Sequence, residues 1–164
     1  MFSLEINNKA SNILQLCQQK SVTIVTAESC TGGLIAGCLT EIPGSSGVIE
    51  GGFVTYSNQA KISMLSVKLE QLDQYGAVSE EVARSMAEGA LRRSKADIAI
   101  ACTGVAGPGG ATNTKPIGLV HLTCALRTHP AVHKQCNFSG DRSTIRMATI
   151  NAAFGLIEAQ LNII

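Results

Sequence analysis

The stretch SVTIVTAESCTGG (residues 21–33) decides the fold, because it joins an apolar segment to a second one through a polar turn rich in glycine. Its first seven residues (21–27) are rich in β-branched side chains and predict a buried strand. The segment that follows the turn (residues 33–39) predicts a short helix packed closely on the sheet. A strand that leads through a short turn into a helix is the basic unit of α/β proteins.

The same arrangement of a strand followed by a polar loop occurs twice more. VIEGGFVTYS (residues 48–57) predicts a second strand, and NQAKISMLSV (residues 58–67) predicts a short helix after it, capped by Ser57 or Asn58. DIAIACTG (residues 97–104) is continuously apolar, which is typical of a strand in the centre of a sheet. It leads into a glycine- and proline-rich loop over residues 104–118.

The remaining segments predict two more strands and two further helices. A stripe of apolar residues at helical spacing predicts a helix around residues 10–17. Ser79, followed by two glutamates, predicts the start of another helix. The short link RTHPA between strands 119–126 and 132–138 predicts an antiparallel hairpin.

With a last helix over residues 142–161, the predicted order is α-β-α-β-α-α-β-β-β-α. Strands joined through helices imply parallel pairing with right-handed crossovers, whereas the hairpin adds antiparallel pairing. We therefore predict a three-layer α/β/α sandwich around a mixed, mostly parallel five-stranded sheet. A chain of 164 residues suits one such domain, over residues 1–164.

Composition argues against several classes of partner and compartment. Thirteen basic and twelve acidic residues leave a net charge of +1, which gives no electrostatic footprint for nucleic acid or for a membrane surface. We recognise neither a signal peptide nor an apolar run long enough to span a membrane. The six cysteines form no C-x-x-C pair and lie mostly in apolar segments. We therefore expect buried, reduced thiols, a cytoplasmic protein and no metal site.

Ligands of such sheets gather at the carboxyl ends of the parallel strands. Three polar loops follow predicted strands and are expected to meet at that edge. They are ESCTGG (residues 28–33), TYSNQAK (residues 55–61) and TGVAGPGG (residues 103–110).

In the first of these loops, Ser29 has two interpretations. A serine at a sharp strand-to-helix turn can present its hydroxyl as a nucleophile, and amides at the helix start can stabilise an oxyanion. The same residues also fit ordinary helix capping by Ser29 or Thr31. If Ser29 is the nucleophile, we expect Thr31 or Glu28 to cap the helix instead. Cys30 is either a rival nucleophile or a packed small residue.

A serine nucleophile needs a base. His121, His129 and His133 lie in or beside the predicted hairpin without any partner signature, so structural roles are favoured and a Ser-His-Asp triad is not supported. Lys61 is the alternative, because burial lets a lysine accept a proton. It follows the second strand closely, as does Tyr56. The same position also fits a surface lysine on a helix.

The segment FSGDRSTIR (residues 138–146) precedes the last helix, with Asp141 or Ser139 as candidate caps. Arg142 and Arg146 in the first turns oppose the helix dipole. This mismatch indicates either a phosphate or carboxylate ligand, or an ion pair with a residue such as Asp141.

Five segments occur together in one order: TAESCTGGLIAGCLTEIPGSSGVIEGGFVTYSNQAK, YGAVSEEVA, CTGVAGPGG, KPIGLVHL and GDR. In this combination, over nearly the whole chain, the sequence resembles the CinA C-terminal domain family, and most of all its stand-alone nicotinamide-nucleotide amidohydrolases. The resemblance implies hydrolysis of the carboxamide of nicotinamide mononucleotide (NMN) to nicotinate mononucleotide and ammonia, in pyridine nucleotide salvage. It implies no metal and no organic cofactor.

The resemblance also implies roles for individual residues. Ser29, Tyr56 and Lys61 match a catalytic Ser-Tyr-Lys arrangement. The residues expected to contact the substrate are Thr31, Gly32, Gly33, Thr103, Gly104 and Arg142. We expect the only partners to be this small substrate and further copies of the chain in a homo-oligomer. The alternative is a nucleotide-binding accessory module without turnover, linked to competence or the response to DNA damage.

Overall fold

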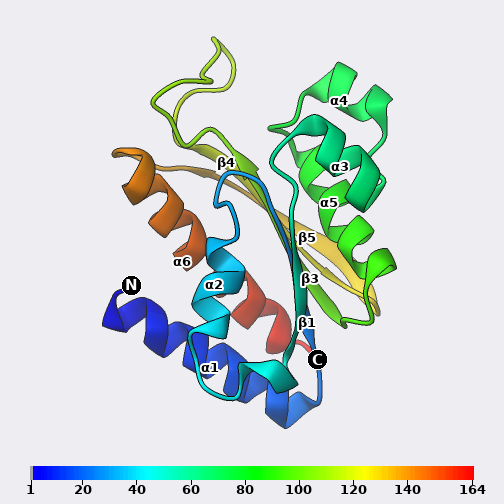
Figure 1. The fold of residues 1–164 in the computed structure, drawn as a ribbon, viewed down its shortest axis with the longest axis vertical. Coiled ribbons are helices and arrows are strands. Elements are labelled where there is room, and N and C mark those ends of the chain that lie inside the picture. The colour runs from blue at the N-terminus through cyan, green and yellow to red at the C-terminus, as the bar shows by residue number, and fades with distance from the viewer. Residues whose placement is uncertain (1) are drawn as a thin grey trace.

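One five-stranded sheet runs through the middle of the protein, with the strand order β2-β1-β3-β4-β5. The computed structural model describes residues 2–164, and Figure 1 shows helices on both faces of the sheet. The strands are β1 (Ile24–Glu28), β2 (Ile49–Val54), β3 (Ile98–Gly104), β4 (Leu119–Leu126) and β5 (His129–Asn137). The helices are α1 (Leu4–Lys20), α2 (Leu34–Thr40), the 3-10 turn η1 (Ser45–Gly47), α3 (Asn58–Leu65), α4 (Leu69–Tyr75), α5 (Glu80–Arg93) and α6 (Arg142–Leu161).

The strand pairing confirms the predicted α/β sandwich on a mixed sheet. β1 lies parallel to both β2 and β3, whereas β4 is antiparallel to β3 and to β5. The predicted hairpin is therefore present. Its turn is shorter than predicted, because β5 already begins at His129 rather than at residue 132.

Two further details of the predicted elements were wrong. The sequence pattern does not predict α4, because LEQLDQY is only seven residues long and buries a single side chain, Leu72. Such a short, mostly polar segment carries no helical periodicity that could be detected. The second strand also ends earlier than predicted, at Val54. The residues after Val54 are consequently free to form the loop that enters α3.

The alternation of side chains on the central strand separates two apolar cores. On β3, Ile98, Ile100 and Cys102 face the core beneath α1, α2 and α6. Ala99 and Ala101 face the other core, beneath α3, α4 and α5. The side chain of Thr103 continues this second row and faces α5 at the end of the strand. No helix within residues 2–164 combines the length and the apolar character that a membrane crossing requires.

The predicted helix starts are confirmed by their capping contacts. Ser57, Ser79 and Asp141 each accept a hydrogen bond from the amide three residues on, at the starts of α3, α5 and α6. Each cap satisfies an amide that has no partner within its helix. These caps fix where the three helices begin. The starts of α3 and α6 lie at the edge of the sheet where the parallel strands end.

Candidate active site

A cavity of about 260 Å³ lies where the parallel strands end, as predicted for a sheet of this type. Residues from all three predicted loops and from the start of α6 form its wall. The residues that line it are Ser29, Cys30, Tyr56, Lys61, Ala77, Val78, Thr103, Gly104, Val105, Ala106, Gly107, Gly109, Gly110 and Arg142. The structure therefore brings six of the nine expected site residues together, and it leaves Thr31, Gly32 and Gly33 outside the lining.

Ser29 and Lys61 form the only direct contact between two of the expected catalytic side chains within residues 2–164. The amine Nζ of Lys61 lies 3.0 Å from the hydroxyl Oγ of Ser29. Ser29 directly follows β1, and its amide donates to the carbonyl of Cys102 on β3, which holds the backbone at the sheet edge. The first helical turn of α3 carries Lys61 across to the same point.

The surroundings of Lys61 favour the neutral amine. Its side chain is only 1% exposed, and burial lowers the pKa of the amine from its ordinary value of 10.5. Nζ also contacts the backbone carbonyls of Thr55, at 2.8 Å, and Tyr56, at 3.5 Å. A neutral amine has two N–H donors for these carbonyls and one lone pair for the Ser29 hydroxyl proton. This geometry suits a base that activates a serine.

The turn that carries Ser29 is organised by the buried carboxylate of Glu28. Its two oxygens accept hydrogen bonds from the amides of Gly33, Ile35 and Ala36, at 3.1, 3.0 and 2.8 Å. The hydroxyl of Thr31 donates to the same carboxylate. Of the two caps expected in place of Ser29, Glu28 is therefore the one that satisfies the start of α2. This leaves the Ser29 hydroxyl free to meet Lys61.

Replacing Glu28 with glutamine is expected to lower the free energy of unfolding by about 2–4 kcal/mol, because the amide nitrogen cannot accept from the donors that now surround it. Chemical denaturation measures this loss. Glu41→Gln, at the exposed end of α2, is the matched control and should change stability by less than about 0.5 kcal/mol. Equal stability of the two variants would show that Glu28 does not hold the turn.

The positions of Thr31, Gly32 and Gly33 give no support to the predicted substrate contacts. The amides of Gly32 and Gly33 already donate to the Ser29 carbonyl and to Glu28. Thr31 is fully buried. Its carbonyl accepts a hydrogen bond from Arg146 at 2.7 Å. These residues shape the turn, and the two glycines adopt positive φ angles of 63° and 93° that favour glycine.

Arg142 and Tyr56 meet on the opposite wall of the cavity. The guanidinium of Arg142 donates to the Tyr56 hydroxyl at 2.9 Å and to the carbonyl of Gly107 at 2.8 Å. The alternative left open by the sequence, an ion pair of Arg142 with Asp141, is absent among residues 2–164, where that carboxylate caps α6 through Thr144. Tyr56 is 60% exposed, and within residues 2–164 its hydroxyl contacts neither Ser29 nor Lys61. Tyr56 thus reaches the lysine only through its backbone carbonyl.

The third loop contributes its backbone and one threonine. The hydroxyl of Thr103 donates to the carbonyl of Ala77 at 2.8 Å, which fixes the segment before α5 against the sheet. A Cβ on Gly104 would lie 2.8 Å from the carbonyl oxygen of Leu119, so only glycine fits this strand end. Sequence reasoning missed the Ala77–Val78 segment as part of the cavity wall, since apolar residues in a loop carry no functional signal.

Cys30 lines the cavity, but its chemistry is that of a protonated thiol. The pKa of Cys30 is raised well above its ordinary value by the neighbouring thiol of Cys102 and by burial. All six cysteines are buried, as expected for small apolar side chains. The structure therefore favours the packed-residue interpretation of Cys30 over the rival nucleophile.

Replacing Cys30 with serine is expected to leave the rate within about threefold of wild type, because the neighbouring Cys102 thiol and burial keep the Cys30 thiol protonated. Rates of ammonia release from the substrate proposed below measure the effect. A complete loss of rate in a folded Cys30→Ser protein would instead support the cysteine as nucleophile.

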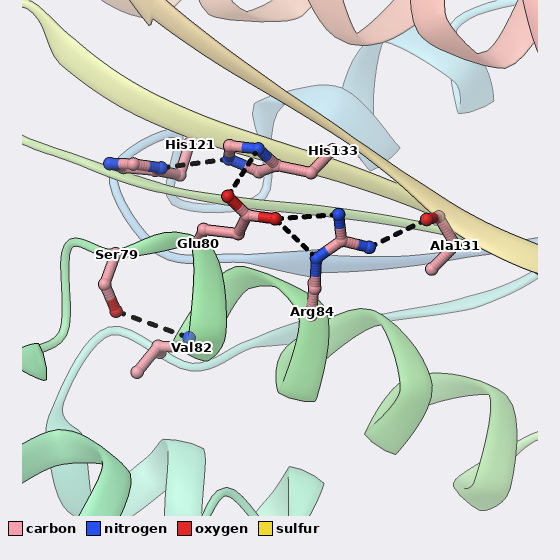
Figure 2. A network of polar contacts seen from close by, with 7 residues as sticks. All are labelled: Ser79, Glu80, Val82, Arg84, His121, Ala131 and His133. Carbon is pink, nitrogen blue, oxygen red and sulfur yellow. Dashed lines mark hydrogen bonds and ion pairs between the residues drawn. The ribbon is translucent and has the colours of Figure 1, made fainter.

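None of the three histidines lines this cavity, which agrees with the sequence-based rejection of a Ser-His-Asp triad. His121 contacts His133, and His133 contacts Glu80 of α5, on the face of the sheet that α5 covers (Figure 2). Their side chains connect α5 to the hairpin, a role that no sequence pattern indicated.

The fold and the cavity define an α/β domain that holds a buried serine–lysine pair at the carboxyl edge of its parallel strands. The protein-family model of the CinA C-terminal domain matches residues 6–161 of this sequence. The chain belongs to this family, as the resemblance predicted.

Relatives and solved structures agree with this assignment. The chain is 50% identical over 143 residues to a CinA-like protein of Akkermansia muciniphila, covering 87% of this chain and 34% of that protein. It thus spans about a third of the length of the curated relatives it matches. A crystal structure of competence/damage inducible protein CihA from Agrobacterium tumefaciens is 47% identical, with a TM-score of 0.96 over 99% of this chain and 98% of that one. A CinA superfamily protein from Escherichia coli is 34% identical, with a TM-score of 0.90 over 96% and 92%.

Proposed function

We propose that this protein is a serine amidase that hydrolyses the carboxamide of NMN to nicotinate mononucleotide and ammonia. The observation that carries the proposal is the 3.0 Å contact between the Ser29 hydroxyl and a buried lysine amine, inside a cavity at the ligand-binding edge of the sheet. The choice of NMN as the substrate rests on the residues that this chain shares with the CinA C-terminal domain family. The salvage of pyridine nucleotides is the proposed cellular role.

The first half-reaction forms an ester on Ser29. The serine oxygen attacks the carboxamide carbon while Lys61 takes the hydroxyl proton directly, since the Tyr56 hydroxyl faces Arg142 instead. The resulting tetrahedral oxyanion needs preorganised N–H donors, worth about 3 kcal/mol each. The amides of Gly32 and Gly33 are already used within the turn. We therefore assign this role to the amide of Cys30 and to the loop amides that line the cavity.

The first half-reaction ends as the protonated Lys61 returns its proton to the leaving nitrogen, the C–N bond breaks, and ammonia departs from the ester on Ser29. The second half-reaction releases the acid. Water then attacks the ester, Lys61 accepts a proton from it, and the collapse of the second tetrahedral intermediate returns that proton to the Ser29 oxygen. The products are nicotinate mononucleotide and the free enzyme, so atoms and charges balance without a cofactor.

Arg142 is the proposed anchor for the 5′-phosphate of the substrate. Its guanidinium lines the cavity and is held in place by the Tyr56 hydroxyl and the Gly107 carbonyl. A guanidinium retains further N–H donors for phosphate oxygens in this position. Thr103 and Gly104 line the wall near this end of the proposed substrate.

Replacing Arg142 with alanine is expected to raise the KM for NMN by about 10- to 100-fold, since one charge-assisted contact is worth about 1.5–3 kcal/mol. The KM for nicotinamide riboside, which lacks the phosphate, should change little. Steady-state ammonia release from both substrates separates these outcomes. An equal rise for both substrates would show that Arg142 does not recognise the phosphate.

The proposed activity is tested by incubating the protein with NMN, nicotinamide or NAD and measuring ammonia. Ammonia released with an equal amount of nicotinate mononucleotide, from NMN in preference to the other two, is the expected result. Saturable binding of NMN without ammonia would instead identify a nucleotide-binding accessory module. The names of the relatives refer to competence and damage, and this alternative would connect the chain to competence or to the response to DNA damage.

We further propose that the protein works in the cytoplasm as a homo-oligomer. The buried thiols fit a reducing compartment. Light scattering coupled to size-exclusion chromatography measures the oligomeric state.

A further inference from the structure

A second cavity, of about 380 Å³, adjoins the proposed active site and takes no part in the reaction above. Val78 lines both cavities, so the Ala77–Val78 segment forms the wall between them. The register of the sheet explains why the two cavities lie side by side. Thr103 on β3 pairs with His121 on β4, and His121 pairs with Gln135 on β5. Thr103 lines the first cavity, whereas His121 and Gln135 line the second.

A chain of polar contacts ends at this second cavity (Figure 2). The Nδ1 atom of His121 lies 2.9 Å from the Nε2 atom of His133, and Nδ1 of His133 lies 3.3 Å from the Glu80 carboxylate. Arg84 donates to the same carboxylate at 2.7 and 2.8 Å. Arg84 also bonds to the carbonyl of Ala131 at 2.7 Å, so the chain is anchored to both α5 and β5.

These contacts determine which nitrogen of each ring carries a proton. Burial lowers the pKa of both histidines, which keeps the rings neutral at pH 7. The Glu80 carboxylate can only accept, so Nδ1 of His133 donates and its Nε2 accepts. Nδ1 of His121 must then donate to His133, and Nε2 of His121 is left with a lone pair.

That lone pair has no hydrogen-bond partner within the part of the chain that the structure describes, and Nε2 keeps accessible surface although His121 as a whole is only 8% exposed. In Figure 2 the second nitrogen of His121 points away from His133. The cavity is the space that this ring lines. The fold orients this acceptor through three further residues and leaves it unpaired at the cavity, where a hydrogen-bond donor from outside the chain can reach it.

The other residues that line the second cavity indicate which kind of donor would bind there. Glu81 contributes a carboxylate that forms no ion pair within residues 2–164. Tyr75, Val78 and Leu119 supply an aromatic ring and apolar side chains. Lys115 also lines the second cavity, and its amine donates to the backbone carbonyl of Tyr75. No group of three metal-binding side chains exists among residues 2–164, so a metal ion does not fit.

We propose that this second cavity binds a small organic cation, a primary ammonium group on an apolar body. The ammonium donates to Nε2 of His121 and to the Glu81 carboxylate, and the apolar body packs against Tyr75 and Leu119. The site is separate from the serine–lysine pair, so the proposal does not depend on the amidase activity.

The test titrates the full-length protein with 2-phenylethylammonium chloride at pH 7.5 and follows binding by protein NMR. Neutral 2-phenylethanol and anionic 3-phenylpropionate have similar size and serve as matched probes. We expect saturable binding of the ammonium at millimolar concentration, with a shift of the His121 Nε2 resonance. The two other probes should bind at least about tenfold more weakly. Equal binding of all three, or no binding of the ammonium, would overturn the proposal.

Two variants locate the site. Glu81→Gln and His121→Gln should each weaken binding of 2-phenylethylammonium at least about tenfold. Glu88→Gln, on the exposed side of the same helix, should not change it. His121 is buried, so thermal unfolding is measured first, and Glu81→Gln alone decides if the histidine variant fails to fold. Unchanged affinity in a folded Glu81→Gln protein would refute the site as described.

Discussion

Replacing Ser29 with alanine will lower the rate of ammonia release from NMN by at least about 10⁴-fold, the loss typical of a removed serine nucleophile. Within residues 2–164 the hydroxyl of Ser29 has a single side-chain hydrogen bond, with Lys61, so its removal leaves the turn and the rest of the cavity wall intact. Steady-state kinetics and binding of NMN measure the two expected effects, a lost kcat and a nearly unchanged Kd.

The matched control for this variant is Ser46→Ala, an exposed serine in the 3-10 turn before β2. It should retain the wild-type rate. Ammonia release by Ser29→Ala at more than a tenth of the wild-type rate would remove Ser29 from the mechanism, whatever the outcome for the control.

Replacing Lys61 with arginine will lower kcat by about 10²–10⁴-fold, because a guanidinium stays protonated and cannot accept the serine proton. Lys61→Met removes the base while keeping an unbranched side chain, and it should cause a loss of the same order. Lys68→Arg, at an exposed position before α4, is the matched control. Thermal unfolding of each variant separates a lost base from a lost fold.

The wild-type rate should also depend on pH through Lys61. Only the neutral amine accepts the proton, so kcat/KM rises with pH, and burial places the midpoint below the ordinary value of 10.5. The rising limb should be absent from any residual activity of Lys61→Met. A rate that falls with pH across this range would show that the protonated lysine is the active form.

Burying the Lys61 amine has a cost in stability. The amine is almost completely buried, with two backbone carbonyls and one hydroxyl around it and no carboxylate in contact among residues 2–164. An unfolded chain hydrates the protonated amine freely, and the folded state gives up that favourable hydration. A catalytic role therefore explains this buried lysine better than a role in packing does.

The sequence predicted the elements in which local pattern and burial agree. The apolar strands β3 and β4, the turn ESCTGG and the caps Ser57 and Ser79 carry their own signals, and each occurs where expected. The order of strands and polar loops also predicted that residues far apart in the chain meet at one edge of the sheet. The requirement that Ser29 remain free left Thr31 or Glu28 as the cap, and the structure shows Glu28 in this role.

Other features depend on atoms that leave no trace in the residue pattern. The carbonyls of Thr55 and Tyr56 hold the lysine amine, yet any residue types would supply them. The Tyr56 hydroxyl contacts Arg142 from a helix 86 residues away, which only the packing of α6 determines. The amides of Gly32 and Gly33 look available in the sequence, but the turn itself uses them.

The most direct test of the serine amidase is to incubate the wild-type protein with NMN and hydroxylamine. An ester on Ser29 would react with hydroxylamine to form the hydroxamate of nicotinate mononucleotide, and the serine hydroxyl would be regenerated. We predict that ammonia is released and that hydroxamate replaces nicotinate mononucleotide as the hydroxylamine concentration rises. Ammonia release with no hydroxamate at any concentration would contradict the ester on Ser29, and binding of NMN without ammonia would contradict the amidase itself.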